Sequence, residues 1–119
     1  MLSKDELAAR LSEVRASLAG RAELVAVSKF HPADYVRLSY ELGQRLFGES
    51  RVQELVAKHE ALAADCPDIV WHFIGPLQTN KVKYLAPFIH MIESVTSERL
   101  LEEINRQGQR VGRRIPILL

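Results

Sequence analysis

A lysine directly follows the first buried strand that the sequence predicts. Residues 23–28 form a short apolar run with β-branched members, and Lys29 comes next. In barrels and open sheets of parallel strands, ligands collect at this carboxyl end. Apolar surroundings favour the neutral form of a lysine, which can attack an aldehyde and form a Schiff base. A solvated surface lysine is the more common occupant of such a position, so both interpretations stay open on position alone.

Polar residues also follow the second predicted strand, which covers residues 45–48. Glu49 could hydrogen-bond to or pair with a lysine, but a single carboxylate is weak evidence for acid–base chemistry. Ser50 and Gln53 match a capping box, so the start of a helix explains both residues as well as a ligand site does. The residues alone leave these two interpretations open.

Residues 71–81 are the least ordinary segment, because an aromatic-rich strand runs into a turn with Gln, Asn and Lys. Polar groups at a strand end indicate a site. His72 by itself favours a hydrogen-bonded histidine over a metal ligand, since the other histidines and the isolated Cys66 have no ligand spacing with it. We therefore expect no metal. No Gly-x-Ser-x-Gly elbow or Cys/His pair indicates nucleophilic hydrolysis.

The elements that must position these residues alternate between strand and helix. Predicted strands begin near residues 23, 45, 69, 88 and 115, with helical patterns between them. This alternation is typical of consecutive right-handed β/α units and a parallel sheet, so the predicted fold class is α/β. Periodicity does not choose between an open doubly wound sheet and part of an eight-stranded barrel.

The helical patterns have recognisable start and stop signals. Ser3 and Glu6 form a capping-box pair for the first helix, which Gly20 ends, and Pro32 suits the first turn of the second helix, which Gly43 ends. The remaining patterns are a helix after Ser50 with Val52, Leu55, Val56 and His59 on one side, a short helix that includes residues 80–84, and a helix with Leu100, Leu101 and Ile104.

Composition and charge exclude several functional classes. The 119 residues are 47% hydrophobic and carry sixteen Lys and Arg against fifteen Asp and Glu, a formal net charge of +1. No large electrostatic field favours nucleic acid or an acidic membrane as a partner. No apolar run approaches the ~20 residues of a membrane span, and no secretory signal or Gly-rich nucleotide fingerprint is present. A cytoplasmic location is the simplest expectation.

Three segments together resemble one known family. They are VAVSK at 25–29, FGESRVQE at 47–54 and WHFIGPLQTNK at 71–81. In this order they resemble the pyridoxal phosphate homeostasis protein family, whose members look like the barrel domain of alanine racemase. The resemblance implies that residues 1–119 are the N-terminal half of a (β/α)8 barrel. This half would comprise an N-terminal helix, about four β/α units and the start of a fifth strand at 115–119.

The resemblance also implies a cofactor and a site. Pyridoxal 5'-phosphate (PLP) would be held as a Schiff base on Lys29, with Ser50, His72 and Ile74 as further cofactor-binding residues and no catalytic or metal-binding residue. Ser50 stands where the family usually has Asn, and its hydroxyl reaches less far towards a cofactor ring than an amide does. The implied function is non-catalytic cofactor homeostasis, by storage, buffering or delivery of PLP.

Two alternatives remain beside this function. A PLP-dependent amino-acid racemase needs a second base opposite the cofactor. None is identifiable, because Tyr35, Tyr40 and Tyr84 all fall within helical patterns. The other alternative is an inactive module that must associate with a C-terminal half.

The length of the chain differs from that of the family. An eight-stranded barrel needs about 200 residues or more, and its phosphate site is commonly built by the loops after strands seven and eight. We therefore expect a truncated barrel that lacks this phosphate site. The full-length form is expected to be a monomer, whereas the exposed sheet edges of this chain favour self-association.

Overall fold

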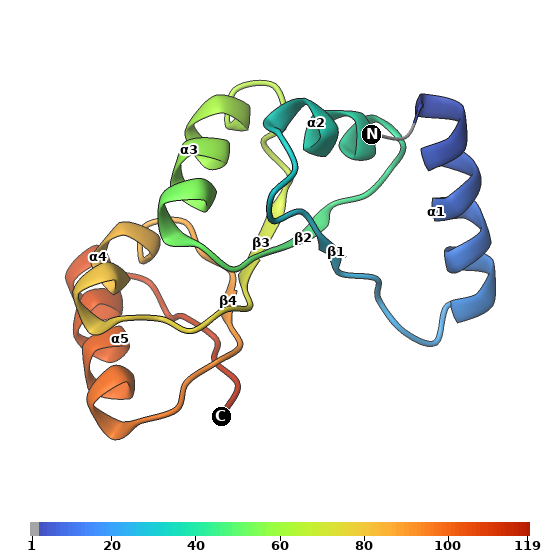
Figure 1. The fold of residues 1–119 in the computed structure, drawn as a ribbon. Helices are drawn as coiled ribbons and strands as arrows, with labels where there is room; N and C mark the ends of the chain where they lie inside the picture. The colour runs from blue at the N-terminus through green and yellow to red at the C-terminus, as the bar shows by residue number, and fades with distance from the viewer. Residues whose placement is uncertain (1–2) are drawn as a thin grey trace.

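Strands and helices alternate along residues 3–119, the part of the chain that the computed structural model describes. The predicted α/β alternation is therefore confirmed (Figure 1). In chain order the elements are α1 (Lys4–Leu18), β1 (Ala26–Val27), α2 (Ala33–Glu41), β2 (Leu46–Glu49), α3 (Val52–Leu62), β3 (Val70–Phe73), the 3₁₀ helix η1 (Thr79–Lys81), α4 (Val82–Leu85), β4 (Met91–Ile92) and α5 (Glu98–Val111).

The strands form one parallel sheet in the order β1-β2-β3-β4. Ala26 pairs with Phe47, Phe47 with Trp71 and Phe73 with Ile92. The predicted fifth strand is present as a parallel bridge between Ile92 and Ile117. Consecutive strands are thus neighbours throughout, as in consecutive β/α units.

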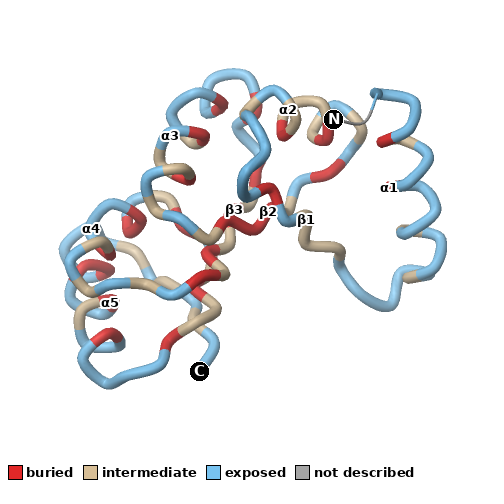
Figure 2. The backbone as a smooth tube through the Cα atoms, viewed as in Figure 1, coloured by how far each residue is buried: buried red, intermediate tan, exposed pale blue. Residues whose placement is uncertain are grey.

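Helices α2, α3, α4 and α5 lie along one side of the strands, and α1 stands beyond β1 (Figure 1). The buried residues concentrate where these helices face the sheet (Figure 2). The core contains Val36, Phe47, Leu55, Leu62, Trp71, Phe73, Val82, Leu85, Ile92, Leu100 and Ile104. The opposite side of the strands has no covering layer of helices among residues 3–119. Within the same residues, no helix has the length and apolarity that a bilayer crossing requires.

The first helix begins as predicted, whereas α3 does not. The side chain of Ser3 accepts a hydrogen bond of 3.1 Å from the backbone N–H of Glu6. The N-cap of α3 is Arg51, which makes no side-chain capping bond, so the predicted capping box of Ser50 and Gln53 is wrong. Ser50 instead packs at the strand end, where an added Cβ on Gly75 would lie 2.5 Å from its carbonyl oxygen.

The buried side of α3 also differs from the prediction. The residues buried against the sheet are Leu55, Lys58 and Leu62, and the predicted His59 is only partly buried. These three recur at helical spacing, so a charged residue occupies the middle of an apolar stripe. Lys58 is accommodated there because its ammonium reaches the Ser28 carbonyl and the carboxylates of Glu49 and Glu54.

Candidate functional site

Successive residues of the central strands point to opposite sides of the sheet. Phe47, Trp71 and Phe73 are buried on the helical side. Because side chains alternate along a strand, the His72 side chain and the side-chain position of its partner Gly48 face the open side. The open side is therefore where a ligand can approach the sheet.

Of the four predicted site residues, His72 belongs to β3, and Lys29, Ser50 and Ile74 follow the ends of β1, β2 and β3. Val27 pairs with Gly48, Gly48 with His72, and His72 with Met91. The hydrogen bonds from Ile74 N to Glu49 O (2.8 Å) and from Glu93 N to Phe73 O (2.9 Å) continue the ladder towards the carboxyl ends. Two residues after Val27, Gly48, His72 and Met91 along the chain come Lys29, Ser50, Ile74 and Glu93, in that order.

Lys29 is exposed and lies in a turn at the end of β1. Its neighbours Val27 and Phe30 are 51% and 67% exposed. The apolar surroundings expected for this lysine are thus not present within residues 3–119. The physical reason is that the open side of a single sheet layer leaves its side chains in contact with solvent.

His72 forms a hydrogen bond with a carboxylate, so the prediction of a hydrogen-bonded histidine is confirmed. Its Nδ1 lies 3.0 Å from Oε2 of Glu93, which follows β4. The described part of the chain contains no group of three His, Cys, Asp or Glu side chains arranged to hold a metal. Sequence reasoning gave Glu93 no role, although its place at the end of a predicted strand was an available signal.

Small residues let the strand ends approach one another closely. An added Cβ on Gly48 would lie 3.1 Å from both Ile74 Cδ1 and Val25 Cγ1. Ile74 therefore lies directly over Gly48, beside the position of Ser50. An apolar side chain, a hydroxyl and an imidazole thus come together at the adjoining ends of β2 and β3.

A buried polar network lies beneath the Lys29 turn, on the helical side of the sheet. The ammonium of Lys58 donates hydrogen bonds to Ser28 O (2.7 Å), Glu49 Oε2 (2.8 Å) and Glu54 Oε1 (2.9 Å). The Ser28 hydroxyl also donates to Glu49 Oε2. The pairing of Glu49 with a lysine is therefore confirmed, with Lys58 as the partner.

Glu54 connects this network to the backbone after Lys29. Its Oε1 accepts a hydrogen bond of 2.6 Å from the N–H of Phe30. Burial opposes ionisation of Glu54, but the hydrogen bonds from Lys58 and Phe30 outweigh it and lower the pKa of this carboxyl below 4.5. Sequence reasoning missed Lys58 and Glu54. The available signal was a lysine within the apolar stripe of α3.

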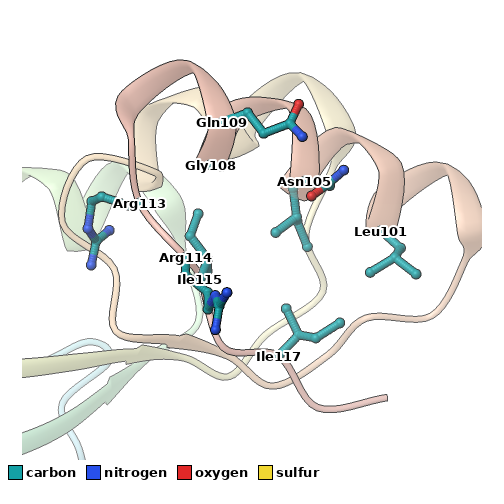
Figure 3. A pocket seen from close by; sticks show the side chains of 9 residues that line it. Leu101, Asn105, Gly108, Gln109, Arg113, Arg114, Ile115 and Ile117 are labelled. Carbon is teal, nitrogen blue, oxygen red and sulfur yellow. The ribbon is translucent and has the colours of Figure 1, made fainter.

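Two hollows lie near the helices. One of about 580 Å³ adjoins the strand ends between Ser50, the start of α3 and residues 76–81. The other, of about 280 Å³, separates α5 from the C-terminal segment and is lined by Leu101, Ile104, Ile115 and Ile117 among others (Figure 3). The second is remote from Lys29, because β1 and β4 are at opposite ends of the sheet.

Known proteins are similar to this chain in both sequence and fold. The family model described as alanine racemase, N-terminal domain, matches residues 2–119. The pyridoxal phosphate homeostasis protein of Bos taurus is 46% identical over 93 residues, which are 75% of this chain and 34% of that protein. That of Aquifex aeolicus is 44% identical over 87 residues, with 73% and 37% covered.

A solved relative has the same arrangement of strands and helices. The structure of PipY from Synechococcus elongatus PCC7942 with PLP bound matches with a TM-score of 0.91 and 42% identity, over 95% of this chain and 53% of PipY. This chain therefore spans about a third of the length of the curated relatives and about half of PipY. The barrel alternative, rather than the open sheet, is thus the correct one. The chain belongs to the alanine racemase N-terminal domain family, and its parallel sheet corresponds to the N-terminal part of a (β/α)8 barrel.

Proposed function

We propose that the chain binds PLP on the open side of the sheet, as part of a protein of cofactor homeostasis that stores, buffers or delivers it. Lys29 holds the cofactor as a Schiff base in this proposal. The observation that supports it is the strand register, in which Val27, Gly48 and His72 are neighbours across β1, β2 and β3. Lys29, Ser50 and Ile74 each follow two residues later in the sequence. The names of the relatives and the PLP in the PipY structure support the same cofactor.

The chemical groups of these four residues suit a ligand that has an aromatic ring and an aldehyde. PLP supplies an aldehyde that condenses with a primary amine with loss of one water, and an electron-withdrawing ring. Lys29 is exposed and makes no ion pair with any side chain of residues 3–119, so its amine is accessible to such a ligand. Ile74 offers an apolar surface, and Ser50 and His72 offer hydrogen-bonding groups.

His72 is held in one orientation by its partner. A hydrogen bond between its Nδ1 and Glu93 fixes the plane of the imidazole ring and leaves Nε2 for a second partner. In the proposal, Nε2 meets a polar group of the ligand. Ser50 is held by its packing against Gly75, and therefore presents its hydroxyl from a fixed backbone position.

The proposal is tested by mixing the purified chain with PLP, recording the visible absorbance spectrum and reducing with borohydride. The expected result is a covalent adduct that peptide mapping locates at Lys29. Lys29→Ala should abolish this adduct, whereas Lys83→Ala, which removes an exposed lysine on α4, should leave it unchanged. Equal labelling of the wild-type chain and the Lys29→Ala variant would refute Lys29 as the cofactor lysine.

A further inference from the structure

The backbone around Lys29 adopts a turn that its own sequence does not favour. The N–H of His31 donates to Ser28 O at 3.1 Å and closes the turn. Phe30, at the third position, has a φ of 66°. In β-turns a positive φ at this position favours glycine, and a bulky side chain there is strained. The turn therefore needs stabilisation from outside.

Contacts from α3 supply that stabilisation. Glu54 accepts a hydrogen bond from the N–H of Phe30 at 2.6 Å, and Lys58 donates to Ser28 O at 2.7 Å. The guanidinium of Arg51 lies 4.6 Å from the centre of the Phe30 ring. The residues on both sides of Lys29 are thus attached to one helix, while Lys29 itself is left free of these contacts.

Burying the charged groups of this network costs free energy, so stability alone does not explain why they are there. Lys58 is 5% exposed and Glu49 0%, and the ammonium of Lys58 uses all three of its donors on Ser28, Glu49 and Glu54. Apolar residues of similar size often stabilise a protein as well as a buried ion pair does. Because Lys58 sits between Leu55 and Leu62 in the apolar stripe, an aliphatic residue would fit the helix pattern equally well.

We propose that Glu54 and Lys58 are positioning residues for Lys29. They hold residues 28–30 in the turn that directs the Lys29 side chain to the open side of the sheet, and so keep it ready for its ligand. This inference rests on the proposed role of Lys29 in binding PLP. In this inference α3, on the helical side of the sheet, fixes the backbone of the turn that carries Lys29.

Glu54 is the residue to change, because it is only partly buried and its loss leaves the Lys58–Glu49 pair in place. Glu54→Ala removes the acceptor for Phe30 N–H, whereas Glu54→Gln keeps a side-chain oxygen at the same distance along the chain. Glu60→Ala, on the exposed side of α3, is the matched control. Each variant is compared with the wild-type chain by hydrogen exchange of the Phe30 amide and by titration of borohydride-trapped PLP at Lys29.

In Glu54→Ala we expect the Phe30 amide to exchange at least about tenfold faster, because the turn opens locally. The apparent affinity for PLP should fall by about tenfold, since only the fraction of chains with the formed turn is competent to bind. Glu60→Ala should resemble the wild type in both measurements, and Glu54→Gln should lie closer to the wild type than Glu54→Ala does. A Phe30 amide that exchanges at the wild-type rate in Glu54→Ala, or unchanged PLP affinity beside fast exchange, would overturn the positioning role.

The two proposals fail in different ways. Absence of trapped PLP at Lys29 in the wild-type chain overturns the proposed function, and with it the purpose assigned to the turn. Trapped PLP at Lys29 in the wild type, with equal affinity in Glu54→Ala, overturns only the positioning role. Hydrogen exchange of the Phe30 amide needs no cofactor, so it measures opening of the turn independently of PLP binding.

Discussion

Lys58 on α3 donates a hydrogen bond of 2.7 Å to the backbone carbonyl of Ser28, the residue before Lys29. Thirty positions of sequence separate the two partners. Their contact joins the helical side of the sheet to the turn that presents the predicted cofactor lysine. The following predictions test this arrangement and the core that supports it.

Lys58→Met should destabilise the chain strongly. Removal of the ammonium leaves the carboxylate of Glu49 buried without its charged partner, and breaking a buried pair in this way costs about 3–5 kcal/mol. The double variant Lys58→Met, Glu49→Leu should recover a large part of this loss, because no buried charge remains. Urea denaturation of the single and double variants measures both. A single variant as stable as the wild type would contradict the role of the pair.

The contribution of Glu54 to stability should depend on pH in a defined direction. Its pKa is lowered in the folded chain, so its stabilising effect is fully present above the unfolded value of about 4.5 and is lost as pH falls through the folded pKa. We expect the difference in unfolding free energy between the wild type and Glu54→Gln to shrink as the pH is lowered from about 6 to below about 4. Denaturation curves across this range are the measurement, and a difference that grows towards acid would have the wrong sign.

His59 should make the chain less stable in mild acid. Its ring stacks on Phe88 with 3.8 Å between ring centres, and burial lowers its pKa from 6.5, although the nearby Glu60 acts in the opposite direction. The unfolded chain then binds the proton more readily than the folded one, so stability falls as pH drops below about 6.5. His59→Phe keeps the stack without a titrating group, and its stability should fall less between pH 7.5 and 5.5. Parallel pH curves for the two proteins would refute this assignment.

Gly75→Ala should disturb the end of β3 more than Gly48→Ala does. The added Cβ would lie 2.5 Å from a backbone oxygen of Ser50, whereas at Gly48 the nearest atoms, at 3.1 Å, belong to side chains that can rotate. Overpacking of this kind costs about 1–3 kcal/mol. Chemical denaturation gives the two values, and amide exchange of Ser50 reports the local shift. Equal costs at the two glycines would show that the backbone at Ser50 yields easily.

Phe73→Ala should cost about 3–5 kcal/mol, because its fully buried ring leaves a cavity between the sheet and the helices. Tyr84→Ala removes an aromatic ring that is 49% exposed, and should change the unfolding free energy by less than about 1 kcal/mol. Thermal or urea unfolding of both variants provides the comparison. Similar losses of unfolding free energy in the two variants would show that Phe73 is not part of the core.

Local patterns in the sequence determined the class of fold and the position of Lys29. The apolar run before Lys29 and the helical stripe of α5 are set by neighbouring residues, and the order of such segments implies a parallel sheet. The same periodicity could not choose between an open sheet and a barrel, since both have the same alternation. Capping signals were reliable at Ser3 but failed at Ser50, where packing against Gly75 prevailed over the local pattern.

Only the tertiary structure decided which polar groups meet. The pairs Lys58–Glu49 and His72–Glu93 depend on the register of the strands and on the rotation of α3 against them. These quantities arise from packing between distant segments, and no short window of sequence encodes them. The exposure of Lys29 has the same origin, because it depends on which layers cover the sheet and not on the residues beside it.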